Sequence, residues 1–109
     1  MEVSVIIPAF NRRVALAACL GTLARQDYPA ARWEAIVVDD GSSDGTREVA
    51  DSWRAKMPLT VMASGCRRGS GPARNLGVRS ARGSVLVFVD SDVLAPPWFL
   101  SAHMQNHER

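Results

Sequence analysis

The feature that most constrains this chain is a series of four short apolar runs, each followed by polar, glycine or proline residues. The runs are Val3–Ile7, Ala35–Val38, Leu59–Met62 and Val85–Val89. Apolar runs of this length, rich in β-branched residues and bounded by turn signals, predict buried strands. Because the runs are apolar throughout instead of alternating, they are typical of a parallel sheet that is covered on both faces.

Helical segments separate these runs. Leucines at helical spacing predict a helix over residues 12–26, with Asn11 as its N-cap, and Asp44 is expected to cap the next helix. This alternation predicts an α/β fold, a doubly wound and mainly parallel sheet with helices on both faces, in which strand one lies beside strand four. The remaining helical segments are expected around Val49, Trp53 and Met57, over residues 72–81, and from Pro96 and Pro97 to His103.

Length and composition fit one soluble globular unit. The chain has 109 residues, of which 47% are hydrophobic and 22% charged, and its formal net charge is +2. We expect no nucleic-acid partner, because the one dense basic group carries no interleaved aromatic residue. Its members are Arg67, Arg68, Arg74, Arg79 and Arg82.

The sequence shows no pattern of a disulfide framework, a signal peptide or a membrane-spanning segment. Cys19 and Cys66 are too few for a disulfide framework, and Cys19 falls in an apolar helical stretch where a small core residue is expected. The start of the chain does not have the pattern of a signal peptide, and no apolar run is long enough to span a membrane. A cytoplasmic location is the expectation that follows by default.

The cluster after the fourth run, Asp90-Ser91-Asp92, has the chemistry of a cation site. Two carboxylates close together repel each other unless a cation or a proton lies between them. Oxygen ligands of this kind suit Mg²⁺ or Mn²⁺, which commonly binds a substrate phosphate as well. The same three residues can also simply end a strand and form a turn.

Asp39 and Asp40 follow the second run, and their carboxylates can accept a base N–H or a ribose hydroxyl. An alternative is a calcium-binding EF-hand loop that begins at Asp40. Asp51 stands there in place of the expected glutamate, and the preceding element is predicted to be a strand instead of a helix.

A glycine- and arginine-rich loop follows the third run and includes Gly69, Gly71, Pro72 and Arg74. Glycines that open a helix suggest a phosphate cradle. Arg74 replaces the third glycine of the dinucleotide fingerprint, and the lysine ending of a P-loop is lacking. Arg74 can pair with a diphosphate or can fix the loop through backbone carbonyls.

Taken in order, the motifs resemble those of the family 2 glycosyltransferases. The matching segments are Val5-Ile6-Ile7-Pro8-Ala9-Phe10-Asn11, Val37-Val38-Asp39-Asp40-Gly41-Ser42, Gly71-Pro72-Ala73-Arg74-Asn75-Leu76-Gly77 and Phe88-Val89-Asp90-Ser91-Asp92. The resemblance covers nearly the whole chain. It implies a GT-A fold, a nucleotide-diphosphate-sugar donor, commonly UDP-linked, and a divalent cation, Mn²⁺ or Mg²⁺.

The same resemblance implies roles for single residues. Pro8, Phe10 and Asn11 would line the base and ribose pocket, and Phe10 stands where many members have tyrosine. Asp40, with Asp39 next to it, would contact the base, and Arg74 would lie near the base and phosphates. Asp90 would approach the ribose or the metal and Asp92 would bind the metal directly, while Ser91 between them is counted among the substrate-binding residues.

The resemblance also implies sugar transfer to an acceptor, usually with inversion, by a carboxylate base that follows the metal motif. We expect no such base in this chain, because Glu108 lies in a polar terminal stretch. Residues 1–109 are therefore expected to form one donor-binding unit that lacks the acceptor half. The open edge of strand four then favours a homodimer or aggregation.

Three alternatives stay open at this point. One is a nucleotide-binding module without activity, and another is a dinucleotide-binding domain. The third is a phosphohydrolase with Asp90 as nucleophile and Asp92 as acid and base, although Leu94 stands where that chemistry favours a hydroxyl.

Overall fold

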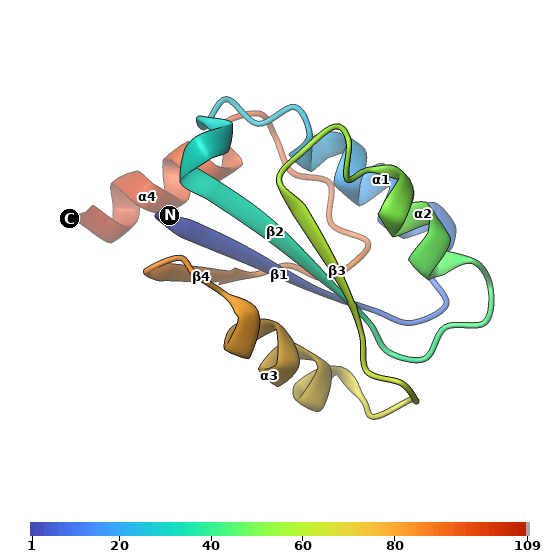
Figure 1. The fold of residues 1–109 in the computed structure, drawn as a ribbon. Coiled ribbons are helices and arrows are strands. Elements are labelled where there is room, and N and C mark those ends of the chain that lie inside the picture. The colour runs from blue at the N-terminus through green and yellow to red at the C-terminus, as the bar shows by residue number, and fades with distance from the viewer. Residues whose placement is uncertain (109) are drawn as a thin grey trace.

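The computed structural model describes the backbone of residues 1–108 and the side chains of residues 1–106 (Figure 1). Four parallel strands form one sheet in the order β3-β2-β1-β4. Strand β1 is central, and its Val3 is in register with Trp33 on one side and Val85 on the other. The predicted fold class and the pairing of the first strand with the fourth are both confirmed. The strands are β1 (Val3–Ala9), β2 (Trp33–Asp39), β3 (Leu59–Ala63) and β4 (Val85–Phe88).

In residues 1–108, three α-helices and one 3₁₀ turn lie between the strands, and a fourth α-helix follows the last strand. They are α1 (Arg13–Leu23), η1 (Ala30–Arg32), α2 (Thr46–Ser52), α3 (Ser70–Ser80) and α4 (Phe99–Glu108). The first helix is shorter than predicted, and Met57 lies beyond the end of α2. No helix in residues 1–108 is long and apolar enough to cross a membrane.

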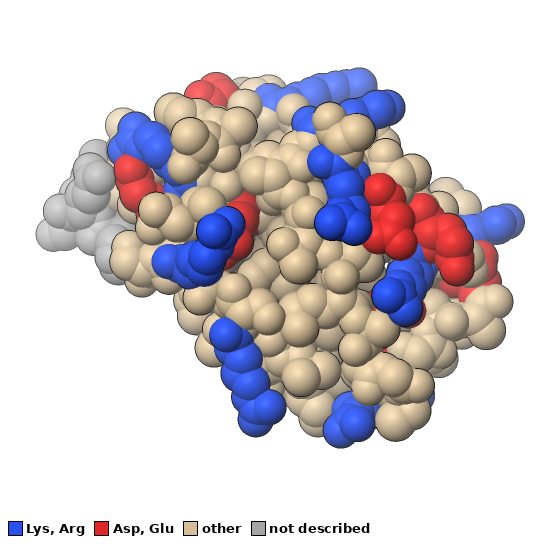
Figure 2. Space-filling view, in the orientation of Figure 1, with Lys and Arg blue, Asp and Glu red and all other residues tan. Residues whose placement is uncertain are grey.

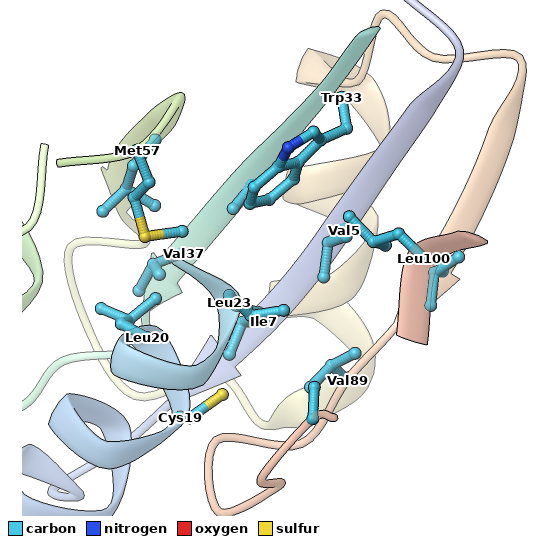
Figure 3. Close-up of a cluster of buried hydrophobic side chains, with 14 of the residues drawn as sticks. Val5, Ile7, Cys19, Leu20, Leu23, Trp33, Val37, Met57, Val89 and Leu100 are labelled. Carbon is cyan, nitrogen blue, oxygen red and sulfur yellow. The ribbon is translucent and has the colours of Figure 1, made fainter. Parts of the chain in front are cut away.

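Helices cover both faces of the sheet, as predicted. Helices α1, α2 and α4 lie on one face and α3 lies on the other (Figure 1). The larger core lies under α1, α2 and α4, where Val5, Ile7 and Leu20 are fully buried in the same cluster as Leu100 of α4 (Figure 3). Burial of each such side chain contributes about 1.5–3 kcal/mol before entropy is counted, so this layer holds most of the hydrophobic stabilisation.

Helix α3 reaches the opposite face of the sheet because it carries small residues on its inner side. Ala73 packs with Ile36 and Val38, and the backbone at Gly77 comes so close to β1 that an added Cβ would lie 2.6 Å from Cγ2 of Ile6. That distance is well inside van der Waals contact, so the packing of α3 depends on the missing side chain of Gly77.

Two helix starts differ from the prediction. Asn11 does not cap α1: it adopts a φ of 50°, and its side-chain oxygen accepts a hydrogen bond from the N–H of Ser43 at 2.9 Å. Asp44 precedes the N-cap of α2, Gly45, and accepts hydrogen bonds from the N–H groups of Thr46 and Arg13. Both side chains therefore tie the β1–α1 loop to the β2–α2 loop, and the sequence alone does not reveal donors that lie in a distant loop.

A buried carboxylate organises the other end of the sheet. Glu34 of β2 accepts hydrogen bonds from the hydroxyl of Ser4 in β1 and from the backbone N–H of Arg82, just before β4. Burial tends to raise the pKa of Glu34, but these hydrogen bonds and the attraction of the Arg82 guanidinium hold it below its ordinary value. Gly83 also donates its N–H to the Ser4 hydroxyl, so one small network fixes where β4 joins β1.

The outer edge of β4 is the least covered part of the sheet. Phe88 is 50% exposed and Leu86 is 37% exposed, and no strand among residues 1–108 pairs with this edge. The predicted open edge is therefore present in the described part of the chain.

Gly77→Ala is expected to destabilise the fold by about 1–3 kcal/mol, although alanine is the better helix former, because the new methyl group must displace Ile6. Gly71→Ala, in the same helix, is the matched control, since nothing lies within 4 Å of its added Cβ. Urea denaturation followed by circular dichroism measures both variants. A Gly77→Ala protein as stable as the Gly71→Ala protein would contradict the close packing of α3.

Candidate functional site

A cleft of about 240 Å³ opens at the carboxyl ends of the strands. It lies beyond the end of β1, between β2 on one side and β4 on the other. The strand order reverses at this point, and open α/β sheets bind ligands at such points. Figure 2 shows acidic and basic side chains gathered on the right of the view, over the position of α2 and the loop that precedes it in Figure 1. The cleft is lined by Pro8, Ala9, Phe10, Arg12, Asp40, Arg67, Ser70, Asp90, Ser91 and Asp92.

Six of the nine predicted site residues line this cleft: Pro8, Phe10, Asp40, Asp90, Ser91 and Asp92. The other three, Asn11, Asp39 and Arg74, are absent from its lining. Arg12, Arg67 and Ser70 line it as well and were not singled out as site residues. Their sequence signal was only a place next to a predicted strand end or in the arginine group, which gives no side-chain direction.

Asp40 is the most constrained group in the cleft. Its side chain is 2% exposed, and each carboxylate oxygen lies within hydrogen-bonding distance of two donor groups. Oδ1 accepts from the hydroxyl of Ser64 at 2.9 Å and the N–H of Arg68 at 3.0 Å. Oδ2 accepts from the N–H of Gly69 at 2.8 Å and from Arg67 at 3.1 Å. The carboxylate therefore holds the loop between β3 and α3 in place.

These contacts also set the charge state of Asp40. Burial tends to raise the pKa of its carboxyl, but the hydrogen bonds from Arg68, Gly69 and Ser64 and the attraction of Arg67 hold the pKa below its ordinary value. Asp40 is therefore an anion at neutral pH.

Asp39 faces away from the cleft. Neighbouring residues at the end of a strand tend to point to opposite sides, and Asp39 and Asp40 line different hollows. Oδ1 of Asp39 accepts the N–H of Ser42 at 3.2 Å, and Asp39 lines a separate hollow with Gly41 and Arg47 on the side of α2. In this structure Asp39 shapes the β2–α2 turn.

Phe10 supplies the flat apolar wall of the cleft. The guanidinium carbon of Arg67 lies 3.9 Å from the centre of its ring, which is a close cation–π contact. Arg67 therefore joins the aromatic wall to the buried carboxylate of Asp40.

Asp90 and Asp92 form the opposite wall. Strand β4 ends at Phe88, so the two aspartates lie in a following turn instead of on a continuing strand, and both are exposed. The side chain of Asp90 is 71% exposed and lies 3.5 Å from the guanidinium of Arg74 in α3. Arg74 thus reaches the edge of the site through Asp90.

Cys19 lies beneath this turn, with its sulfur 4.0 Å from the carbonyl oxygen of Asp90. Burial, together with the nearby charge of Asp92, raises the pKa of the Cys19 thiol to about 11. Cys19 is therefore a neutral, buried group that packs under the site, in agreement with its predicted place in the core.

The two exposed carboxylates fit a particular kind of metal site. No cluster of three or more His, Cys, Asp or Glu side chains suited to a metal occurs in the described part of the chain. Asp90 and Asp92 alone cannot enclose an ion, but Mg²⁺ commonly takes one or two carboxylates and completes its shell with water and substrate phosphates. The residues therefore fit a cation that is shared with a phosphate-bearing ligand.

Asp40→Asn is expected to lower the free energy of unfolding by about 2 kcal/mol at pH 7, because an amide group then faces buried N–H donors. The folded pKa of Asp40 is depressed, so the advantage of the wild type is complete above the ordinary value of 3.8 and disappears as the pH falls through the folded pKa. Denaturation from pH 7 to pH 3 measures this. Asp51→Asn, an exposed control, should change stability by less than about 0.5 kcal/mol, and a pH-independent Asp40→Asn effect would contradict the assignment.

Comparison with known proteins agrees with this arrangement. Residues 4–109 match the family described as Glycosyl transferase family 2. YfnE of Bacillus subtilis, described as an uncharacterized glycosyltransferase, is 40% identical over 108 residues, which are 99% of this chain and 27% of YfnE.

Two solved structures share the fold. Residues 1–349 of Staphylococcus aureus TarS in complex with UDP-GlcNAc superpose with a TM-score of 0.94 at 33% identity, over 99% of this chain and 31% of that one. The mannosyltransferase PcManGT of Pyrobaculum calidifontis, in complex with GDP-Man and Mn²⁺, gives a TM-score of 0.91 at 32% identity, over 95% of this chain and 31% of that one.

The chain spans about a third or less of each of these proteins. Within that span the strand order, the GT-A arrangement and the family match agree. The chain belongs to glycosyl transferase family 2.

Proposed function

We propose that the cleft binds the donor of a glycosyl transfer, a nucleotide-diphosphate sugar with UDP as the first candidate. The observation that supports this most is that one cleft combines a flat aromatic wall, a buried anionic acceptor and an exposed pair of carboxylates. A nucleotide-diphosphate sugar needs these three features in the same order: a surface for its base, an acceptor for a base or ribose donor, and a place for a cation on its diphosphate. The complexes of TarS with UDP-GlcNAc and of PcManGT with GDP-Man and Mn²⁺ support the same ligand class.

The base would lie at the Phe10 end of the cleft. Phe10 offers a ring face for stacking, and Asp40 is an anion that accepts N–H donors. Asn11 and Asp39 would act indirectly, because both hold the β2–α2 turn, through Ser43 and Ser42 respectively.

The diphosphate would lie at the Asp90 end of the cleft. Asp90 and Asp92 would hold a divalent cation, Mn²⁺ or Mg²⁺, and such a cation, when bound, neutralises the charge that develops on the leaving diphosphate. Arg74 positions Asp90 through their contact at 3.5 Å and adds a positive charge near the same end. Ser91 is buried between the two aspartates and lines the cleft with them.

Transfer to an acceptor, with inversion as the family expectation, requires a base for the acceptor hydroxyl. Among residues 1–106, the carboxylates that line the cleft are Asp40, which is surrounded by donor groups, and the pair assigned to the cation. Those residues therefore offer the cleft no spare carboxylate. This observation favours a second candidate for this chain by itself, nucleotide-sugar binding without turnover.

Calorimetric titration with UDP, GDP and dTDP, in Mn²⁺ and in EDTA, tests the donor site. We expect UDP to bind more tightly in Mn²⁺, and Asp92→Ala to lose that difference, with a drop in affinity of at least about tenfold, as even outer-shell changes at metal sites produce. Asp51→Ala is the matched control, because Asp51 lies on α2 and pairs with Arg54. A folded wild-type protein that binds none of the three nucleotides would refute the proposal.

We also propose that the open edge of β4 pairs with a second copy of the chain, because an uncovered strand edge with apolar side chains invites pairing. Phe88→Lys should therefore shift the protein toward monomer in sedimentation velocity at high concentration. Val14→Lys, which replaces a 76% exposed residue of α1, is the control and should leave the association unchanged. A wild-type protein that stays monomeric at high concentration would rule out this pairing.

A further inference from the structure

Arg67 makes two contacts in the cleft that a nucleobase would also make. Its NH1 group donates to Oδ2 of Asp40 at 3.1 Å, and its flat guanidinium lies over the ring of Phe10 with 3.9 Å from carbon to ring centre. A base bound in this cleft would use its planar face on Phe10 and an N–H group on Asp40. The guanidinium therefore occupies the place of a base in both respects.

The hydrogen bonds to Oδ2 of Asp40 leave no acceptor position on that oxygen for a further donor. A carboxylate oxygen offers about two lone-pair sites, and the N–H of Gly69 and the NH1 group of Arg67 take both on Oδ2. The other groups at the carboxylate belong to the loop itself: the backbone N–H groups of Arg68 and Gly69, and the Ser64 hydroxyl, whose one proton is shared between Asp40 and the carbonyl of Cys66. Arg67 is the one donor on a long side chain, and that side chain is 55% exposed.

The backbone of Arg67 is fixed even though its side chain is exposed. Gly41 has a φ of 83°, and an added Cβ there would lie 2.7 Å from the backbone nitrogen of Arg67. The β2–α2 turn and the loop after β3 are thus in direct backbone contact. The exposed side chain of Arg67 can therefore turn away without a shift of its backbone.

From these contacts we propose that Arg67 is an internal competitor at the base end of the cleft. Its guanidinium must leave both Phe10 and Asp40 before a base can stack and donate to Asp40. Arg67 thereby lowers the affinity of the cleft for a base. It acts by occupying Phe10 and Asp40, and it does not bind the base itself. The inference rests on the proposed donor site and adds a residue to it.

Uridine and UDP separate this role from simple attraction to phosphate. Uridine is neutral, so it reports only the competition at the base end, whereas UDP also loses the attraction of a nearby positive charge when Arg67 is removed. Arg67→Ala should bind uridine about five- to tenfold more tightly than the wild type, because an ion pair with a half-exposed arginine and a cation–π contact no longer have to be broken. The gain for UDP should be smaller.

The experiment is a chemical-shift titration of the wild type, Arg67→Ala and Arg68→Ala with each ligand. Arg68→Ala removes the neighbouring charge but keeps the backbone N–H that binds Asp40, so its affinity for uridine should match that of the wild type. Equal or weaker uridine binding by Arg67→Ala would overturn the inference. A wild type that binds UDP in that same experiment would leave the donor site standing.

The Nε–H resonance of Arg67 gives a second readout on the wild type. We expect uridine to move it toward the frequency of a solvent-exposed arginine, and a resonance unchanged by bound uridine would also overturn the inference. If neither the wild type nor Arg67→Ala binds uridine or UDP, the proposed donor site fails and this inference fails with it.

Discussion

Strand β1 is the element on which the rest of this structure depends. It pairs with β2 on one side and with β4 on the other, and its residues from Val3 to Ile7 are completely buried under the helices of both faces. The chain reverses its direction of winding at this strand, so the end of β1 becomes the bottom of a crevice. Pro8, Ala9 and Phe10 at the end of β1 line the cleft there. Its two walls follow β2 and β4, the strands that pair with β1 on either side.

The base wall of the cleft illustrates how a buried charge can serve a structure and a site at once. Asp40 is costly to bury, and four donors offset that cost by folding the loop after β3 around it. Two of the donors are backbone groups of that loop, whereas Arg67 donates from a side chain that is more than half exposed. A site built this way combines a preformed anion with one exchangeable partner.

The sequence was sufficient for the architecture and for most of the cleft. Apolar runs followed by polar clusters predicted the parallel sheet, and the order of four motifs indicated the family that the comparisons confirmed. Side-chain directions were harder, because they depend on contacts between loops. Asn11 bonds to Ser43 instead of capping α1, and Asp39 points away from Asp40. Arg67 stacks on Phe10, a residue far away in sequence, and nothing in the arginine group distinguished it.

The two walls of the cleft belong to strand pairs of very different sequence separation. Asp40 and its loop depend on β1, β2 and β3, which are consecutive in the chain and pair across single short crossovers. Asp90 and Asp92 depend on β4, which pairs with β1 although β2, β3 and three helices lie between them in the sequence. Closing that long segment costs more chain entropy, and the resulting edge strand has the fewest pairing residues of the sheet. The cleft therefore combines one wall built on strand pairs close in sequence with one wall built on the longest-range strand pair of the sheet.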